Sequence, residues 1–170
     1  KRGLPRIKPP FPATHGLYNK PTVVNNVETL ANLPHILNRG PEWFAAIGSP
    51  SKSTGTRVFC VSGHVKRPGN YEVPMGMTVR ELVYEYAGGM RSDKPIKAFI
   101  PGGASAPFLT PAHLDVKLDF EHVAAAGSML GSGGVTVMEE GTSMVWAALR
   151  LMEFFYHESC GDCSPCREGS

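Results

Sequence analysis

One short amphipathic helix, set between segments that favour β-structure, most constrains what this chain can fold into. Thr78 precedes it and Glu81 follows three residues later, the spacing of a capping box in which each residue satisfies a backbone N–H of the other. Met77 and Leu82 stand where a hydrophobic staple would form. The apolar face is made of Val79, Leu82, Val83 and Tyr86. Such a helix must bury that face, and the Gly88–Gly89 pair predicts its end.

The segments around this helix predict a small sheet. The expected elements are the strands Val58–Val61, Tyr71–Val73, Ile96–Ile100 and Val135–Met138 and a short helix over Phe120–Ala124 closed by Gly127. Hairpin, helix, strand, short helix, strand is the order of a β-grasp fold, in which the helix covers one face of a mixed sheet. We therefore predict the α+β class, with a β-grasp (ubiquitin-like) domain over residues 53–140. The order alone leaves other small α+β folds open.

Helical segments are expected on both sides of this domain. A helix should begin at Asn25 or Asn26, either of which can cap it, with Glu28 at the capping-box spacing from Asn25. Its expected buried face consists of Val27, Leu30, Leu33 and Leu37. Pro34 should kink or divide the helix. A second short helix is expected over Pro41–Ile47, and a linker over Ser49–Gly55.

A second strong helix is predicted over Ser143–Glu158, capped by Thr142 or Ser143. Its polar residues Ser143, Arg150, Glu153 and His157 form one narrow stripe, and the remaining circumference is apolar up to Tyr156. A helix of this kind must be buried on most sides, and the rest of this chain offers too few residues to cover it. We expect Trp146 and Phe154 to stay partly exposed.

Three cysteines follow this helix at a spacing typical of iron–sulfur ligands. Cys160, Cys163 and Cys166 can converge on one cluster, as in the opening of ferredoxin-type [4Fe–4S] runs. In those runs a fourth Cys follows at the position that Ser170 occupies here, so the fourth ligand must come from elsewhere. The competing interpretation is a Cys3His zinc site with His157, although four ligands in ten residues would be cramped.

The remaining features exclude several functions. Hydrophobic residues make up 42% and charged residues 19%, as in folded soluble proteins. No apolar run reaches the roughly 18 residues of a membrane span. The basic residues Lys1, Arg2, Arg6 and Lys8 lie in a Pro-rich segment, which we interpret as extended chain, not as a nucleic-acid site.

Other residues have simpler interpretations. Cys60 is expected in the core of a strand, and the Gly-rich segment 127–134 is expected to form turns because it lacks the Lys of a phosphate loop. Neither a Ser/His/Asp arrangement nor paired carboxylates can be recognised, so no catalytic side chain is assigned. The chain lacks an initiator Met and stops inside the cysteine motif, so we expect it to be a piece of a longer protein.

Several segments, taken together, resemble the NADH-binding flavoprotein subunit of respiratory complex I. The matching segments are Phe11-Pro12-Ala13, Lys20 to Leu30 (KPTVVNNVETL), Ser62-Gly63-His64-Val65, Pro101-Gly102-Gly103 and His157 to Gly169 (HESCGDCSPCREG). The resemblance covers essentially the whole chain. The diaphorase subunits of NAD-linked hydrogenases and formate dehydrogenases share this architecture and are the nearest alternatives.

The resemblance implies a division into three domains. Residues 1–52 would be the end of a Rossmann-like domain that binds FMN and NADH, residues 53–140 the β-grasp (SLBB) domain, and residues 141–170 the start of a helical-bundle [4Fe–4S] domain. Asn25 and Asn26, and less directly Thr29, would contact FMN. Cys160, Cys163 and Cys166 would bind the cluster, with the fourth Cys beyond Ser170. The Gly-rich nucleotide segment would precede Lys1, so the chain alone is expected to be inactive.

The resemblance also implies a place in electron transport. NADH would be the substrate, FMN the first acceptor, and the cluster would pass electrons on towards quinone. Expected partners are the other peripheral-arm subunits, especially the [2Fe–2S] thioredoxin-like subunit, with no nucleic acid and no membrane insertion. The expected location is the cytoplasmic side of the bacterial inner membrane or the mitochondrial matrix side. A non-enzymatic β-grasp module with a structural zinc site is the alternative from another functional class.

Overall fold

The computed structural model describes residues 7–49 and 52–169. It forms two units, one of Glu28–Thr142 and one of Lys1–Val27 with Ser143–Ser170. Lys1, Arg2 and Arg6 of the expected basic segment lie outside the described residues. None of the described helices is both long and apolar enough to cross a bilayer.

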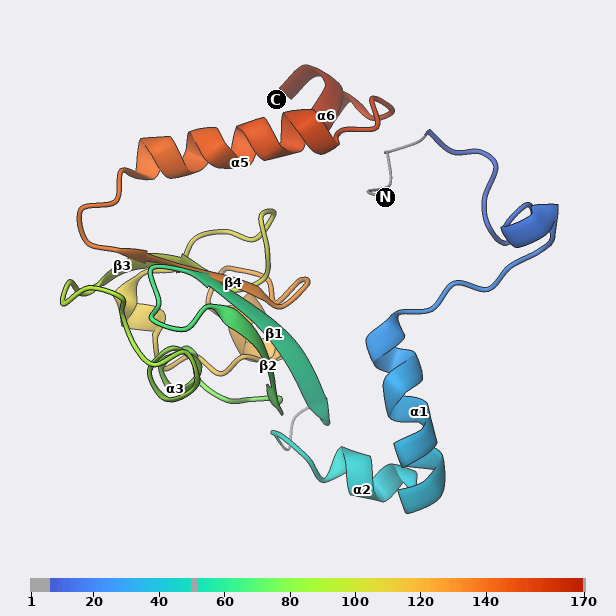
Figure 1. Cartoon of the computed structure of the whole chain (residues 1–170), viewed down its shortest axis with the longest axis horizontal. Coiled ribbons are helices and arrows are strands. Elements are labelled where there is room, and N and C mark those ends of the chain that lie inside the picture. The colour runs from blue at the N-terminus through green and yellow to red at the C-terminus, as the bar shows by residue number, and fades with distance from the viewer. Residues whose placement is uncertain (1–6, 50–51, 170) are drawn as a thin grey trace. The chain divides into compact units, whose positions relative to one another are not determined.

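A four-stranded mixed sheet forms the centre of the larger unit, with strand order β2-β1-β4-β3 (Figure 1). The strands are β1 (Thr56–Gly63), β2 (Gly69–Pro74), β3 (Ile96–Ile100) and β4 (Gly134–Glu139). β1 pairs antiparallel with β2 and parallel with β4, and β3 pairs antiparallel with β4. The parallel pair needs a crossover connection, and the predicted amphipathic helix lies in it. This arrangement confirms the β-grasp prediction.

The crossover helix is built as its sequence predicts, apart from its last turn. α3 (Val79–Glu81) continues into η2 (Leu82–Tyr86), which is a π-helical turn. The hydroxyl of Thr78 accepts the N–H of Glu81 at 3.2 Å, and the Glu81 carboxylate accepts the N–H of Thr78 at 2.8 Å. The expected capping box is therefore present.

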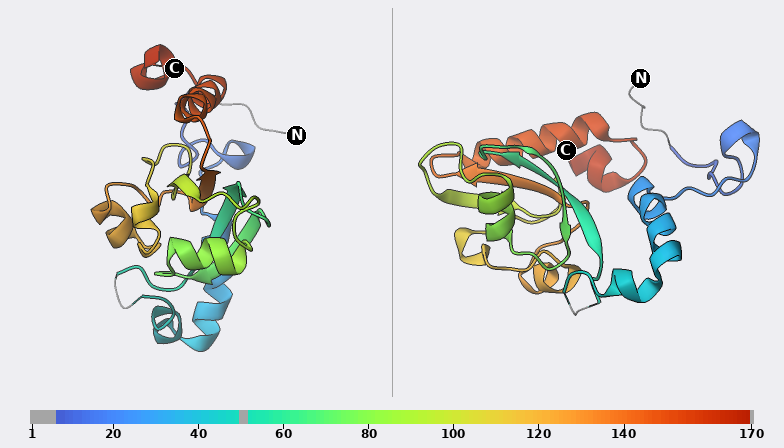
Figure 2. Two further views of the ribbon diagram at one scale, coloured as in Figure 1. Left: turned by 90° about the vertical axis from the view of Figure 1, so that its left-hand side faces the viewer. Right: turned by 60° about the horizontal axis from the view of Figure 1, so that its bottom comes forward.

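The crossover helix lies against one face of the sheet (Figure 2), and its apolar residues belong to the buried core cluster. The largest fully buried side chains are Phe59, Phe99, Leu82, Leu118, Leu130, Val65, Val73, Val79, Val83, Val123, Val135 and Val137. Three of the four helix residues expected in the core are among them. The fourth, Tyr86, is partly buried and meets Tyr71 edge to face.

Cys60 contradicts the prediction that it is a core residue. Phe59 and Val61 on either side of it are buried, whereas Cys60 is exposed. Successive side chains of a strand point to opposite faces of the sheet, so the two neighbours that reach the core direct Cys60 to the other face.

Two short helices and a glycine loop complete the β-grasp domain. They are η3 (Pro111–His113) and α4 (Phe120–Ala125), whose N-cap Asp119 is fully buried. The predicted turn function of the Gly-rich segment is confirmed, because Gly127, Gly131 and Gly133 all have positive φ.

The helices before the sheet differ from expectation in their burial. α1 (Val27–Arg39) begins next to Asn26, as predicted, and it continues through Pro34, so Pro34 does not divide it. None of its residues is buried, and its expected buried face is exposed at Val27 and Leu37. That face was predicted from periodicity, which reports an amphipathic helix but not whether a partner is present. α2 (Pro41–Ala45) follows.

The segment expected to be a linker is attached to the β-grasp domain. The N–H of Ser49 donates to the carbonyl of Met75 at 2.8 Å, and that of Gly55 donates to Ile47 at 2.7 Å. Ser53 is buried, and its hydroxyl donates to Glu121 at 2.6 Å. Residues 50–51 lie outside the described residues. The domain limits at residues 52 and 140 stay predictions.

The smaller unit contains the helices that lead to the cysteines. η1 (Leu17–Asn19) lies in its first segment, and α5 (Met144–Glu158) and α6 (Ser164–Gly169) lie in its second. The hydroxyl of Ser143 caps α5 by accepting the N–H of Trp146 at 3.3 Å. Trp146 and Phe154 are about half exposed, at 52% and 50%, which confirms that expectation.

Candidate functional site

The three clustered cysteines lie on a turn between two helices. α5 ends at Glu158, and the N–H of Gly161 then donates to the hydroxyl of Ser159 at 3.1 Å. Gly161 has a φ of 78°, a left-handed conformation that suits a residue without a Cβ. Cys160 and Cys163 are exposed, and Cys166 is half-buried on α6. Cys60, Cys160 and Cys163 are free thiols.

The cysteine segment supplies suitable donors but not a preassembled site. Over residues 7–49 and 52–169, no three His, Cys, Asp or Glu side chains come together closely enough to hold a metal ion. The donors nevertheless fit a cluster, because three accessible thiols within seven residues are the soft ligands that iron–sulfur clusters take. His157 lies in the last turn of α5, where its ring meets Tyr156 edge to face at 5.5 Å.

The expected flavin contacts lie at the start of α1. Asn25 and Asn26 directly precede the helix, Thr29 lies in its first turn, and all three are exposed. Accessible amide side chains at the N-terminus of a helix suit a phosphate or a ribityl chain. The residues present therefore fit one edge of a flavin site.

Sequence reasoning missed the long-range role of Glu28. It had assigned this residue only to a local capping box. In the structure the Glu28 carboxylate accepts the backbone N–H of Val58 at 2.7 Å, across 30 residues of chain. The sequence carries no signal for this contact, because the donor is a main-chain group that every residue except proline possesses.

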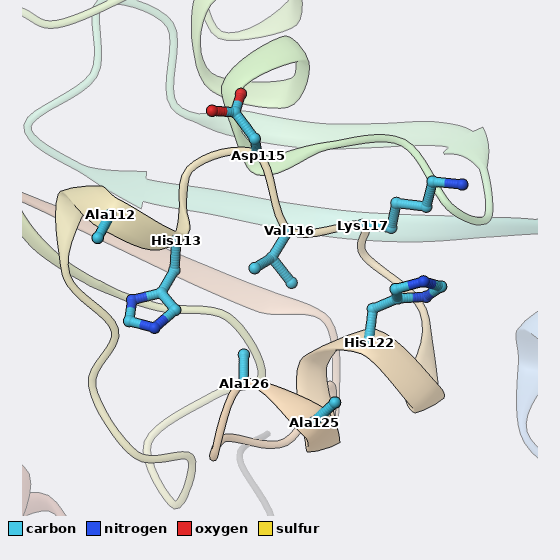
Figure 3. Close-up of a pocket in the computed structure, with 8 residues that line it drawn as sticks. All are labelled: Ala112, His113, Asp115, Val116, Lys117, His122, Ala125 and Ala126. Atoms are coloured by element: carbon cyan, nitrogen blue, oxygen red, sulfur yellow. The ribbon is translucent and has the colours of Figure 1, made fainter.

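A separate pocket of about 550 Å³ lies on the β-grasp domain, between η3 and α4 (Figure 3). His113, Asp115 and His122 contribute polar groups to it, but each has a partner in the fold. Asp115 pairs with Arg80 at 2.6 Å, and this hydrogen bond holds the pKa of the Asp115 carboxyl below its ordinary value. His113 contacts the Thr110 hydroxyl, and His122 contacts buried Asp119. We assign this pocket no ligand.

Two family models match this chain. The SLBB domain matches residues 58–109, which contain most of β1, all of β2 and β3, and the crossover helix. The NADH-ubiquinone oxidoreductase-F iron-sulfur binding region matches residues 146–170, which contain most of α5 and all three clustered cysteines.

Relatives along the full chain agree with both models. The NADH-quinone oxidoreductase F 2 subunit of Rhizobium meliloti is 57% identical over 169 residues, which is 99% of this chain. The corresponding F subunits of Rickettsia typhi and Mycobacterium bovis are 53% and 54% identical over the whole chain. Along its whole length the chain is therefore similar to NADH-quinone oxidoreductase F subunits. It spans 40% of the length of the Rhizobium and Rickettsia relatives and 38% of the Mycobacterium one.

Solved structures extend the similarity to a hydrogenase. Chains of the NAD+-reducing [NiFe]-hydrogenase, in its air-oxidised and H2-reduced states, are 38% identical, with TM-scores of 0.76 and 0.77. Both matches cover 97% of this chain, and they cover 28% and 27% of the hydrogenase chains.

Proposed function

We propose that this chain is the part of an NADH-oxidising flavoprotein subunit that leads from the flavin site to the first three ligands of a [4Fe–4S] cluster. The observation that carries the proposal is the 57% identity with an NADH-quinone oxidoreductase F subunit over nearly the whole chain. The cysteine run lies inside the matched iron–sulfur region, which favours a cluster over the Cys3His zinc site.

Asn25, Asn26 and Thr29 are proposed to hold FMN. The two amide side chains can donate hydrogen bonds to phosphate or ribityl oxygens, and the first turn of α1 adds backbone N–H groups and the positive end of the helix dipole. These groups bind and orient the cofactor without taking part in the redox chemistry.

Cys160, Cys163 and Cys166 are proposed to bind the cluster, with a fourth cysteine supplied from outside these 170 residues. The bound FMN would supply hydride-transfer chemistry with NADH, and the bound cluster would supply one-electron transfer. The turn at Gly161 would let the thiolates of Cys160 and Cys163 approach that of Cys166. Binding must draw the thiols together, because the described residues do not hold them in that arrangement.

The wider assembly follows from the same proposal. The chain would belong to the peripheral arm of complex I, next to the [2Fe–2S] thioredoxin-like subunit. It would lie on the cytoplasmic side of the bacterial inner membrane, or on the matrix side in mitochondria. The 170-residue chain by itself is proposed not to oxidise NADH, because Asn25, Asn26 and Thr29 supply only one edge of a flavin site.

A diaphorase subunit is the second candidate, favoured by the hydrogenase structures, which match 97% of this chain. The two functions differ in the complex that receives the electrons. Purification of the native complex decides between them: quinone reduction with NADH supports the first proposal, and a hydrogenase or formate dehydrogenase partner supports the second.

Metal content of the complete subunit tests the cysteine ligands. Cys163→Ala should abolish bound iron, whereas His157→Ala should leave it unchanged. Cys60→Ala is a matched control, because Cys60 is an exposed free thiol outside the cluster segment. Stoichiometric zinc without iron in anaerobically prepared subunit, lost on His157→Ala, would establish the zinc alternative instead.

Flavin content of the complete subunit tests the helix start. Asn26→Ala should lower the FMN retained after gel filtration. Asn38→Ala, an exposed Asn near the other end of α1, should not change it. Equal flavin content in both variants would rule out the assigned role of Asn26.

A further inference from the structure

The N-terminal half of β1 has one edge that β4 does not cover. The parallel ladder between the two strands begins at Cys60 and Gly134. On this edge Cys60 donates its N–H to Gly133 at 3.0 Å, and His64 donates to Val137 at 2.8 Å. N–H groups two residues apart point to the same edge of a strand, so Val58 directs its N–H to the edge beyond the ladder.

Glu28 provides the partner that β4 does not. Its carboxylate accepts the Val58 N–H at 2.7 Å, the ordinary length of a charge-assisted hydrogen bond. Glu28 is half-buried and lies in the first turn of α1. The contact therefore ties the first turn of α1 to β1, one of the two inner strands of the sheet.

The proposed flavin contacts lie in the first turn of α1 and in the two residues before it. Asn26 and Asn25 lie two and three residues before Glu28, and Thr29 follows it directly. We infer that Glu28 is a positioning residue, which holds the first turn of α1 through Val58 so that these three side chains face the flavin. This inference rests on the proposed FMN site. Displacement of about 1 Å at such a site is enough to weaken its function strongly.

A purely structural role is the competing explanation, and the chain offers a matched control for it. The Glu72 carboxylate also accepts a hydrogen bond from β1, from the hydroxyl of Thr56 at 2.8 Å. Glu72 lies on β2, on the other side of β1 from β4. Glu72→Ala should therefore weaken the sheet without moving α1.

The experiment compares Glu28→Ala, Glu28→Gln, Glu72→Ala and Asn26→Ala in the complete subunit. Glu28→Ala should speed FMN dissociation about tenfold, the effect of losing one hydrogen bond to a charged group. Glu28→Gln keeps an acceptor oxygen and should restore slow dissociation. Glu72→Ala should match wild type in FMN dissociation even if its melting temperature falls.

Hydrogen exchange at the Val58 amide supplies a readout independent of the cofactor. Its exchange should accelerate in Glu28→Ala and stay slow in Glu28→Gln and Glu72→Ala. Unchanged exchange in Glu28→Ala would overturn the inference. If Asn26→Ala releases FMN while Glu28→Ala behaves like Glu72→Ala, the positioning role is wrong and the FMN site stands. If Asn26→Ala retains FMN like wild type, the FMN site itself is wrong and the positioning role falls with it.

Discussion

Leu82 on the crossover helix is fully buried in the core cluster that it shares with the sheet. Leu82→Ala should reduce the free energy of unfolding by about 2–5 kcal/mol, because it leaves a cavity in a packed core. Urea unfolding followed by circular dichroism measures this loss. Tyr84→Ala, on the exposed side of the same turn, should change stability much less, and equal losses would contradict the proposed packing.

Alanine substitutions at Gly131 and Gly127 distinguish the stability lost to backbone strain from the stability lost to steric overlap. Both have positive φ, but a Cβ at Gly131 would overlap the carbonyl oxygen of Gly102, whereas nothing lies within 4 Å of a Cβ at Gly127. Each Ala variant should lose about 1–3 kcal/mol to strain, and Gly131→Ala should lose more. Thermal unfolding tests this order, and a larger loss for Gly127→Ala would count against it.

At the scale of one residue, the sequence did not determine which face of its strand Cys60 occupies. The sequence correctly places it in a strand, but a strand has two faces and composition does not say which one is buried. The alternation from Phe59 to Val61 decided the orientation, and only the packed helix showed which side is the core.

At the scale of the element, the capping box before α3 predicts a pH dependence. Hydrogen bonds from the backbone N–H and the hydroxyl of Thr78 hold the pKa of the Glu81 carboxyl below its ordinary value. A carboxyl with a lowered folded-state pKa contributes stability above its unfolded pKa and loses it as the pH falls through the folded pKa.

Comparison with Glu81→Gln isolates this contribution. The wild-type chain should be more stable than the variant at neutral pH, and its advantage should shrink as the pH falls through the acid range. Urea midpoints across that range measure the difference. A constant difference would show that the Glu81 charge does not stabilise the helix start.

At the scale of the whole molecule, α5 exposes several large apolar side chains. Val145, Trp146, Leu149 and Tyr156 are all at least half exposed. Surfaces of this kind promote association, so the isolated 170-residue chain should self-associate at micromolar concentration. Sedimentation velocity measures this, and Trp146→Glu should reduce it. A monomeric wild-type chain would contradict the prediction.

The sequence by itself determined the local elements and the candidate ligands. The Thr78–Glu81 box, the Ser143 cap and the third strand Ile96–Ile100 all lie where the chain predicts them, because caps and hydrophobic periodicity act over a few residues. The cysteine spacing likewise identifies three candidate ligands without any tertiary information. Their cluster, like the FMN contacts, stays a prediction.

Only the tertiary structure decided which faces are covered and which distant groups meet. Periodicity predicted buried faces on both α1 and the crossover helix, yet only the second has a sheet against it. The Glu28–Val58 hydrogen bond joins a side chain to a backbone group 30 residues away. No local pattern encodes such a contact, because its donor exists at almost every residue and its geometry depends on where β4 stops pairing with β1.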